Sequence, residues 1–169
     1  FISELVSNVK DIPPFCSCSE PAVQPAAEAY SRARKSEQKG DFETARKNYY
    51  LAKDLDCIRF RASEEINDII HELAERYNAQ LVPMKTEYFE KESPNKLIGS
   101  NLLTEHVHPN IDGYFLMAEA FFNSLVKSRL PGNLNEVYYN SSAYYKNNWG
   151  YTQLDSLVAQ HKVSSLMSY

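Results

Sequence analysis

The sequence lacks several features that assign proteins to broad classes. No apolar run approaches the roughly 18–20 residues that a transmembrane helix needs, so we expect no membrane span. No cluster of basic residues is present and the net charge is −4, which argues against nucleic acid as the main partner. The first residues lack the basic-then-apolar order of a signal peptide, and the sequence gives no basis for assigning a cellular location.

Cysteine is also scarce. The chain has three cysteines, Cys16, Cys18 and Cys57, and an odd number does not make a disulfide framework. A zinc site built on them would need further ligands at a suitable spacing, such as a second pair of cysteines. We therefore expect neither a metal nor another cofactor.

What the chain does contain is typical of a globular protein. Its 169 residues suggest one domain, or one domain with a small appendage, and 43% of them are hydrophobic. Residues 26–56 are rich in Ala, Glu, Lys and Arg and are interrupted by Gly40 and Asp41, which predicts a helix–turn–helix. The segment "GDFETARKNYYLAKDLD" resembles one tetratricopeptide hairpin. Because no second copy follows, we expect a lone helical hairpin inserted into another domain.

The remaining pattern alternates between strand and helix. Residues 2–9 and 79–84 are short apolar or β-branched runs and are predicted to be strands, whereas residues 85–101 are predicted to be a loop. Residues 62–78 carry an apolar face at helical spacing, and residues 111–128 are apolar enough to predict a helix with two buried faces. A helix followed at once by a short buried strand is typical of a βαβ unit. The tail from residue 133 is less organised, with one helix predicted within 150–166.

The segment "TEHVHP" at 104–109 is the candidate functional site, and it permits three interpretations. His106 and His108 are two residues apart and would share one face of a strand, which is an arrangement found in metal sites. Further ligands are missing, however, and the zincin spacing His-Glu-x-x-His is absent. The two histidines could also be ordinary surface residues.

The third interpretation is an acid–base pair. Glu105 and His108 are three residues apart, so in a turn their side chains lie on the same side. A carboxylate in this position can accept the Nδ1–H of the imidazole, which leaves Nε2 as a base and stabilises the imidazolium that forms. Pro109 makes the position after the histidine rigid and favours the start of a helix.

The block "EHVHPNIDGYFLMAEAFFNSL" resembles the last conserved block of the SGNH, or GDSL-type, hydrolases. That block runs acid-x-x-His-Pro, then Gly-Tyr, then an apolar helix, and Glu105, His108, Pro109, Gly113 and Tyr114 fill these places. The family usually has Asp at the position of Glu105. Weaker similarity extends over residues 2–15 and 57–128.

This resemblance implies an α/β fold, namely part of a flavodoxin-like three-layer sandwich with a parallel sheet. Residues 1–25 and 57–130 would belong to the hydrolase domain, residues 26–56 to the inserted hairpin, and residues 131–169 to a C-terminal helical extension. It implies hydrolysis or acyl transfer of an acyl ester, with carbohydrate esters among the candidates. His108 would be the general base and Glu105 the acid that orients it.

The other parts of such an enzyme are missing from the sequence. None of its five glycines, at positions 40, 99, 113, 132 and 150, forms the Gly-Asp-Ser block of the family, and neither Ser7 nor Asn8 is assigned a catalytic role. We therefore expect the nucleophile, the oxyanion donors and further strands to lie in an N-terminal part of the same protein, which acts as a partner of this chain. The alternative is a non-catalytic helical interaction module or a pseudo-enzyme.

Overall fold

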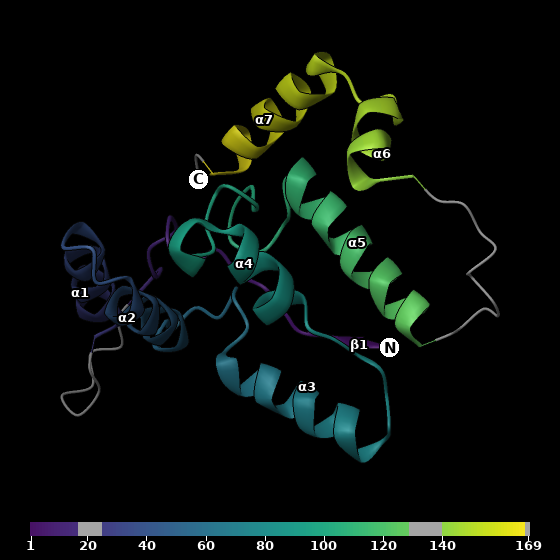
Figure 1. The fold of residues 1–169 in the computed structure, drawn as a ribbon. Helices are drawn as coiled ribbons and strands as arrows, with labels where there is room; N and C mark the ends of the chain where they lie inside the picture. The colour runs from purple at the N-terminus through teal and green to yellow at the C-terminus, as the bar shows by residue number, and fades with distance from the viewer. Residues whose placement is uncertain (17–24, 129–139, 168–169) are drawn as a thin grey trace. The chain divides into compact units, whose positions relative to one another are not determined.

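The computed structural model describes residues 1–16, 25–128 and 140–167. This part of the chain is mostly helical: about 60% of it is helix, and it has seven α-helices (Figure 1). It divides into two compact units, Phe1–Ser124 and Leu125–Tyr169, and each is described by itself. The first unit contains the candidate site.

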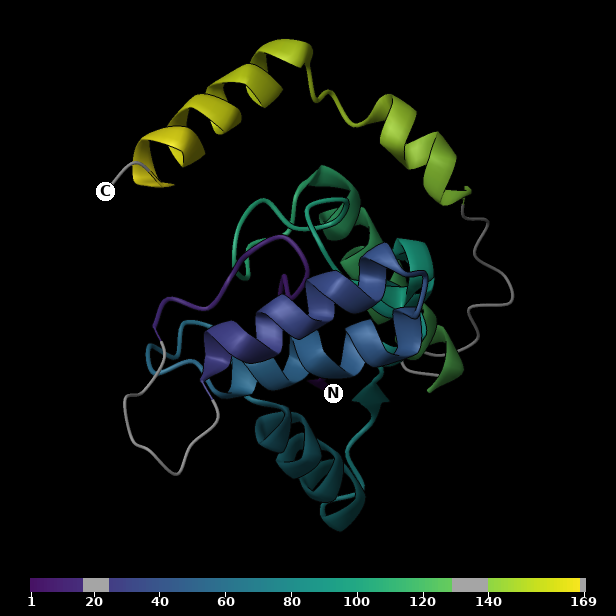
Figure 2. The same ribbon diagram turned by 90° about the vertical axis from the view of Figure 1, so that its left-hand side faces the viewer.

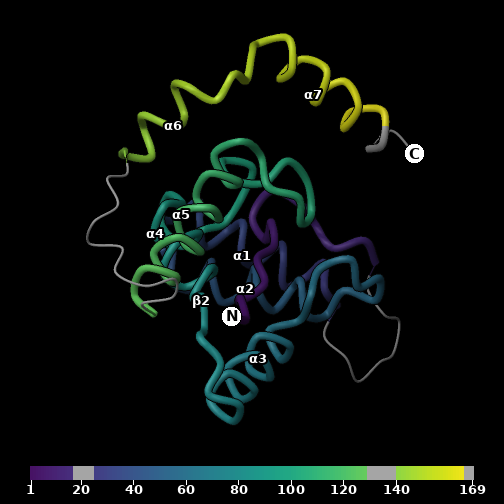
Figure 3. The backbone as a smooth tube through the Cα atoms, turned by 90° about the vertical axis from the view of Figure 1, so that its right-hand side faces the viewer, coloured from purple at the N-terminus to yellow at the C-terminus, as the bar shows by residue number. Residues whose placement is uncertain are grey.

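The predicted flavodoxin-like sandwich is wrong for this chain. Its described residues form one sheet of two short parallel strands, β1 (Ile2–Ser3) and β2 (Leu81–Val82), which lie near the N-terminus (Figure 3). Ile2 is in register with Leu81, and Ser3 with Val82. Two strands of two residues cannot make the middle layer of a sandwich.

The backbone explains why the predicted strand 2–9 stops early. The ladder ends where the Glu4 N–H donates to the Val82 carbonyl. At Leu5, the side chain of Asn67 replaces a neighbouring strand, since it accepts from the Leu5 N–H and donates to the Leu5 carbonyl. The Asn8 N–H then donates to the His106 carbonyl, so the chain bonds to loops from this point on.

The helix–turn–helix predicted for 26–56 is present. Helices α1 (Ala26–Gln38) and α2 (Phe42–Asp54) lie side by side (Figure 2). Small residues on both helices are fully buried and let the backbones approach closely; they are Ala26, Ala29, Ala33, Ala45 and Ala52. In the turn, Gly40 has φ +77°, and the Asp41 carboxylate caps α2 by accepting from the Thr44 N–H.

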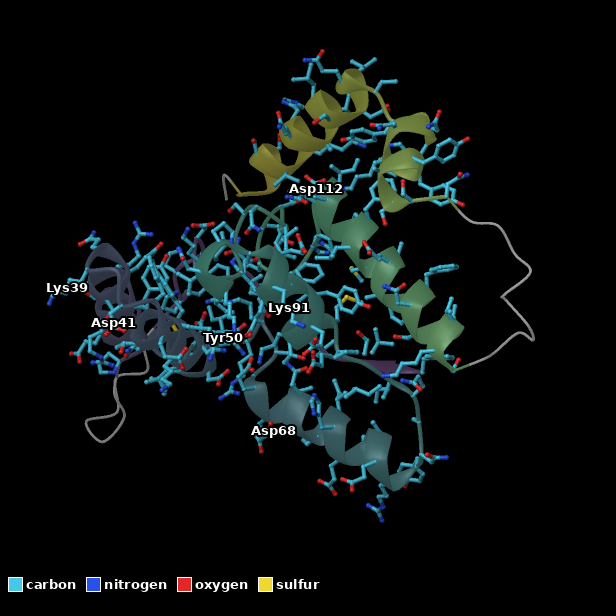
Figure 4. The ribbon with its side chains drawn as sticks, viewed as in Figure 1. Lys39, Asp41, Tyr50, Asp68, Lys91 and Asp112 are labelled. Atoms are coloured by element: carbon cyan, nitrogen blue, oxygen red, sulfur yellow. The ribbon has the colours of Figure 1, made fainter. Side chains whose placement is uncertain are left out.

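A partly buried polar network joins this hairpin to Glu90, which lies beyond β2 in the sequence. The Tyr50 hydroxyl of α2 donates to the Glu90 carboxylate at 2.9 Å, and Arg46 donates to the same carboxylate at 3.3 Å (Figure 4 labels Tyr50). Burial and the neighbouring Glu90 raise the pKa of Tyr50 well above its usual value. Tyr50 therefore stays a hydrogen-bond donor at physiological pH.

Helix α3 (Glu64–Arg76) confirms the helix predicted for 62–78. Its predicted apolar face is only partly covered: Ile70 and Ala74 are buried, whereas Ile66 and Ile69 are exposed. Ser63 stands at the N-cap position without a capping side-chain bond, and the Asp54 carboxylate instead accepts from the Glu64 N–H.

The predicted loop 85–101 is partly helical instead. It contains the π-helical turn η1 (Met84–Phe89), the short helix α4 (Glu90–Glu92) and the 3₁₀ turn η2 (Pro94–Lys96). The buried Glu4 carboxylate, 81 residues before Lys85 in the sequence, accepts hydrogen bonds from the Lys85 and Thr86 N–H groups. The first N–H groups of a helical turn have no partner within the turn, and here the Glu4 carboxylate supplies one. The local sequence does not predict this partner.

Helix α5 (Ile111–Lys127) confirms the helix predicted for 111–128, but with one buried face rather than two. Gly113, Ala120 and Ser124 are buried, whereas Tyr114 is 55% exposed. The helix covers a core cluster made of Val82, Met84, Phe89, Ile98, Leu102, Leu103 and Ala120.

The second unit contains helices α6 (Ser142–Asn148) and α7 (Gln153–Met167). Helix α7 matches the helix predicted within 150–166, whereas α6 was not predicted. Three apolar side chains of α7, Leu154, Leu157 and Val158, are exposed. No helix in the described residues is long and apolar enough to cross a membrane.

Candidate functional site

The "TEHVHP" segment forms a tight loop between the core and α5. Leu103 and Pro109 pair as an isolated antiparallel bridge, and the Thr104 N–H donates to the His108 carbonyl at 2.8 Å. Asn110 fixes the far end of the loop, because its Oδ1 caps α5 at the Gly113 N–H. The loop therefore has a defined shape that the flanking elements hold in place.

Gly113 lets α5 approach this loop closely. A Cβ at this position would lie 2.2 Å from the Leu102 carbonyl oxygen and 2.9 Å from the Pro109 Cβ. No side chain fits there without a shift of the backbone. The glycine is thus required by the approach of the helix to the loop that carries Glu105 and His108.

The Glu105 carboxylate lies at the centre of the loop and accepts hydrogen bonds on both oxygens. Oε1 accepts from the imidazole Nδ1 of His108 and from the His108 backbone N–H at 2.8 Å. Oε2 accepts from the His106 N–H at 2.6 Å and contacts the His106 Nδ1 at 3.0 Å. The contact that the spacing of Glu105 and His108 predicts is therefore present.

These contacts keep Glu105 ionised. Burial by itself raises the pKa of the carboxyl, but hydrogen bonds from the backbone and imidazole of His108 and from the N–H groups of His106 and Val107 outweigh it and lower the pKa to about 2. An ionised carboxylate can only accept hydrogen bonds. It follows that Nδ1 carries the hydrogen in both imidazoles.

The two histidines differ in exposure. The His108 side chain is 75% exposed, and no residue in the described part of the chain hydrogen-bonds its Nε2. The His106 side chain is only 11% exposed. It stacks on Phe15, with ring centroids 4.7 Å apart and planes at 11°, and lies 6.0 Å from the ring of Phe60. His108 is thus the imidazole that faces solvent.

A buried ion pair holds the segment that carries Phe15. The Arg61 guanidinium donates to Asp56 at 3.2 Å, and both residues are almost fully buried. Arg61 also donates to the Asn8 and Ile12 carbonyls, while the Asp56 carboxylate accepts from the Phe15 N–H at 2.9 Å. The sequence suggested no role for this pair, since five residues of spacing in a loop predict no contact.

The other residues considered from the sequence lie elsewhere. Ser7 is buried, and the Asn8 side chain donates to the Ser100 hydroxyl at 3.3 Å. Neither side chain hydrogen-bonds to the exposed Nε2 of His108. His71 forms a second histidine–carboxylate pair, with Nε2 2.8 Å from Glu4. The Glu4 carboxylate also caps η1, so we interpret the pair of His71 and Glu4 as structural.

The described cysteines and metal-binding side chains form no second site, and Cys18 lies outside the described residues. Cys16 has a free thiol, whereas Cys57 is disulfide-bonded. No group of three or more His, Cys, Asp and Glu side chains within residues 1–16, 25–128 and 140–167 is placed to hold a metal ion. A search of known proteins gives no further guidance: no family model, curated protein or solved structure matches this sequence.

Proposed function

We propose that Glu105 and His108 are the acid–base half of a serine-type ester hydrolase related to the SGNH class. The observation that carries the proposal is the ionised Glu105 bonded to Nδ1 of His108, whose Nε2 faces solvent. The proposal depends on this block and its geometry and not on a sandwich fold, which this chain does not form.

Each residue has a defined part in the proposed reaction. Nε2 of His108 takes the proton from a serine hydroxyl as the serine oxygen attacks the ester carbonyl carbon. The imidazolium then gives that proton to the leaving alcohol, which leaves an acyl-serine ester. In the second half of the reaction Nε2 takes a proton from a water that attacks the acyl carbon; the bond to the serine oxygen breaks, the imidazolium returns the proton to that oxygen, and the acid is released. Glu105 keeps its charge throughout, orients the ring and stabilises the imidazolium.

In this proposal the serine and the oxyanion donors come from the N-terminal part of the same protein. The Gly-Asp-Ser block typical of the family does not occur in the 169 residues. The exposure of His108 supports the proposal, because a base that serves a group from another part of the protein must be accessible. The substrate is an acyl ester.

The test is hydrolysis of p-nitrophenyl acetate by the whole protein that contains this chain. We expect His108→Ala to lower kcat/KM by about 10³-fold or more, because it removes the base. We expect Glu105→Gln to lower kcat/KM strongly and Glu105→Asp to retain more activity, since Asp keeps the charge that the imidazolium requires. A fluorophosphonate probe should label one serine of the whole protein.

His71→Ala is the matched control. His71 also contacts a carboxylate through a ring nitrogen and has a half-exposed side chain, but it lies on α3 and not in the loop. We expect it to keep kcat/KM within about twofold, as distant surface changes usually do. A folded whole protein that has no esterase activity, or that keeps it in His108→Ala, would show that the proposal is wrong.

A further inference from the structure

We propose that His106 is a positioning residue that holds Glu105 in the orientation His108 needs. This inference rests on the proposed function and adds to it a role for the second histidine of "HVH". The sequence alone separates the two histidines but assigns no task to His106.

The hydrogen bonds of Glu105 are the first step. Its two oxygens are shared between the histidines, with His108 on Oε1 and His106 on Oε2. The backbone N–H groups of His106 and His108 also donate to Oε2 and Oε1, at 2.6 and 2.8 Å, and rotation of the carboxylate about its last side-chain bond would break these bonds together with the imidazole bonds. The Nδ1–H of His106, 3.0 Å from Oε2, opposes this rotation and so keeps Oε1 directed at His108.

The fixation of the His106 ring is the second step. Its backbone carbonyl accepts from the Asn8 N–H at 2.9 Å, and its ring stacks on Phe15. Phe15 is in turn anchored through its N–H to the buried Asp56. A polar contact positions its partner only if it is itself rigid, and here the stack and the backbone bond supply that rigidity.

The chemistry of Glu105 completes the case. Because Glu105 is ionised, the hydrogen of its contact with His106 must lie on Nδ1 of His106. The ring therefore acts as a donor to the carboxylate. Nothing in this role requires His106 to touch the substrate, since the reacting proton passes through Nε2 of His108.

Two substitutions of His106 separate the hydrogen bond from the packing. His106→Phe keeps an aromatic ring that stacks on Phe15 but removes the donor. His106→Asn removes the ring but places an amide N–H near the position of Nδ1. We expect His106→Phe to lower kcat about tenfold with little change in KM, which is the lower end of the effect seen when orienting partners are removed.

The pH profile gives a readout that a merely structural role would not change. With Glu105 less well oriented, the imidazolium of His108 is less stabilised, so the acid limb of kcat should move to lower pH in His106→Phe. His106→Asn should restore the wild-type limb and a kcat within about threefold of wild type, as far as the amide reproduces the bond.

The outcomes distinguish this inference from the proposed function. If His108→Ala abolishes activity but His106→Phe keeps both kcat and the acid limb, the positioning role is wrong and the proposed function stands. If His106→Asn loses activity and melts at a lowered temperature while His106→Phe keeps both activity and melting temperature, His106 acts only in packing. If His108→Ala is fully active, the proposed function itself is wrong.

A direct measurement in the resting protein completes the test. Long-range ¹H–¹⁵N spectra of histidine-labelled whole protein report which ring nitrogen carries the hydrogen. We expect neutral His106 and His108 both to show the Nδ1–H form, and we expect Glu105→Gln to change both rings. An Nε2–H form of His106 in the wild-type protein would overturn the inference.

Discussion

At the scale of single residues, Glu105 determines the chemistry of the loop. It is one methylene longer than the Asp usual in SGNH hydrolases, and this length lets its two oxygens reach N–H groups of three consecutive residues and two imidazoles. Three of these donors are backbone N–H groups, which bind the carboxylate in the loop, and the imidazoles of His106 and His108 are the other two. The acid is therefore part of the loop's structure as well as of its proposed chemistry.

This dual role predicts a pH-dependent contribution of Glu105 to stability. Its pKa is lowered from 4.5 to about 2 on folding, so the contribution is complete above about pH 4.5 and is lost as the pH falls towards 2. With allowance for partial exposure, the contribution at pH 7 is on the order of 2 kcal/mol. Glu105→Gln should therefore unfold at lower urea concentration at pH 7, and the difference from wild type should shrink between pH 4.5 and 3.

The matched control for this measurement is Glu72→Gln on the outer face of α3. Glu72 is exposed and its carboxylate has no hydrogen bond to any residue that the structure describes. We expect this variant to follow the wild-type urea midpoint closely at each pH. A stability difference for Glu105→Gln that stays constant from pH 7 to 3 would contradict the linkage.

At the scale of elements, the close approach of α5 to the loop is the feature that places the site. An alanine in a helix is favoured over glycine by about 1 kcal/mol. At Gly113, however, the added Cβ would meet the Leu102 carbonyl oxygen at 2.2 Å, and backbone cannot rotate away as a side chain can. The clash therefore outweighs the gain in propensity.

We expect Gly113→Ala to destabilise the protein by about 1–3 kcal/mol and also to reduce the proposed esterase activity, because Pro109 and Leu102 border the loop of Glu105. Gly40→Ala is the comparison. Gly40 has φ +77°, and no atom lies within 4 Å of a Cβ added there. The substitution should therefore cost about 1–2 kcal/mol, because an alanine is strained at this φ, and should leave kcat/KM unchanged. Thermal melts and ester hydrolysis of both variants test this, and equal activity of the two would contradict it.

At the scale of the whole molecule, local and long-range features differ in how well they could be predicted. The helices at 26–56, 62–78 and 111–128 and the contact of Glu105 with His108 depend on neighbours within a few residues, and the sequence predicts them correctly. Two strands are predicted from short apolar runs, and the resemblance implies the parallel sheet, but the pairing of strands depends on partners far along the chain. Here Asn67 and the loop around His106 took those backbone bonds instead.

The parts of the site that could not be predicted are long-range in the same sense. Phe15 stacks on His106, and Glu4 caps η1, in each case across most of the length of the first unit. The sequence around Phe15 or Glu4 does not indicate which distant residues either side chain will contact. A phenylalanine in a proline-rich segment is compatible with a surface loop, and only the folded structure shows that it supports a histidine of the candidate site.

The buried pair of Asp56 and Arg61 should therefore affect the whole first unit, although neither residue is near the proposed chemistry. Removal of one partner leaves the other charge buried and unpaired, so we expect Asp56→Ala to cost about 3–5 kcal/mol. The substitution also removes the acceptor of the Phe15 N–H, so the stack of Phe15 on His106 should loosen and the proposed activity should fall.

Urea unfolding measures the loss of stability, and ester hydrolysis measures the loss of activity. Lys47→Ala, in an exposed ion pair, should cost less than about 0.5 kcal/mol. Similar costs for the two variants would show that the buried pair does not anchor this unit.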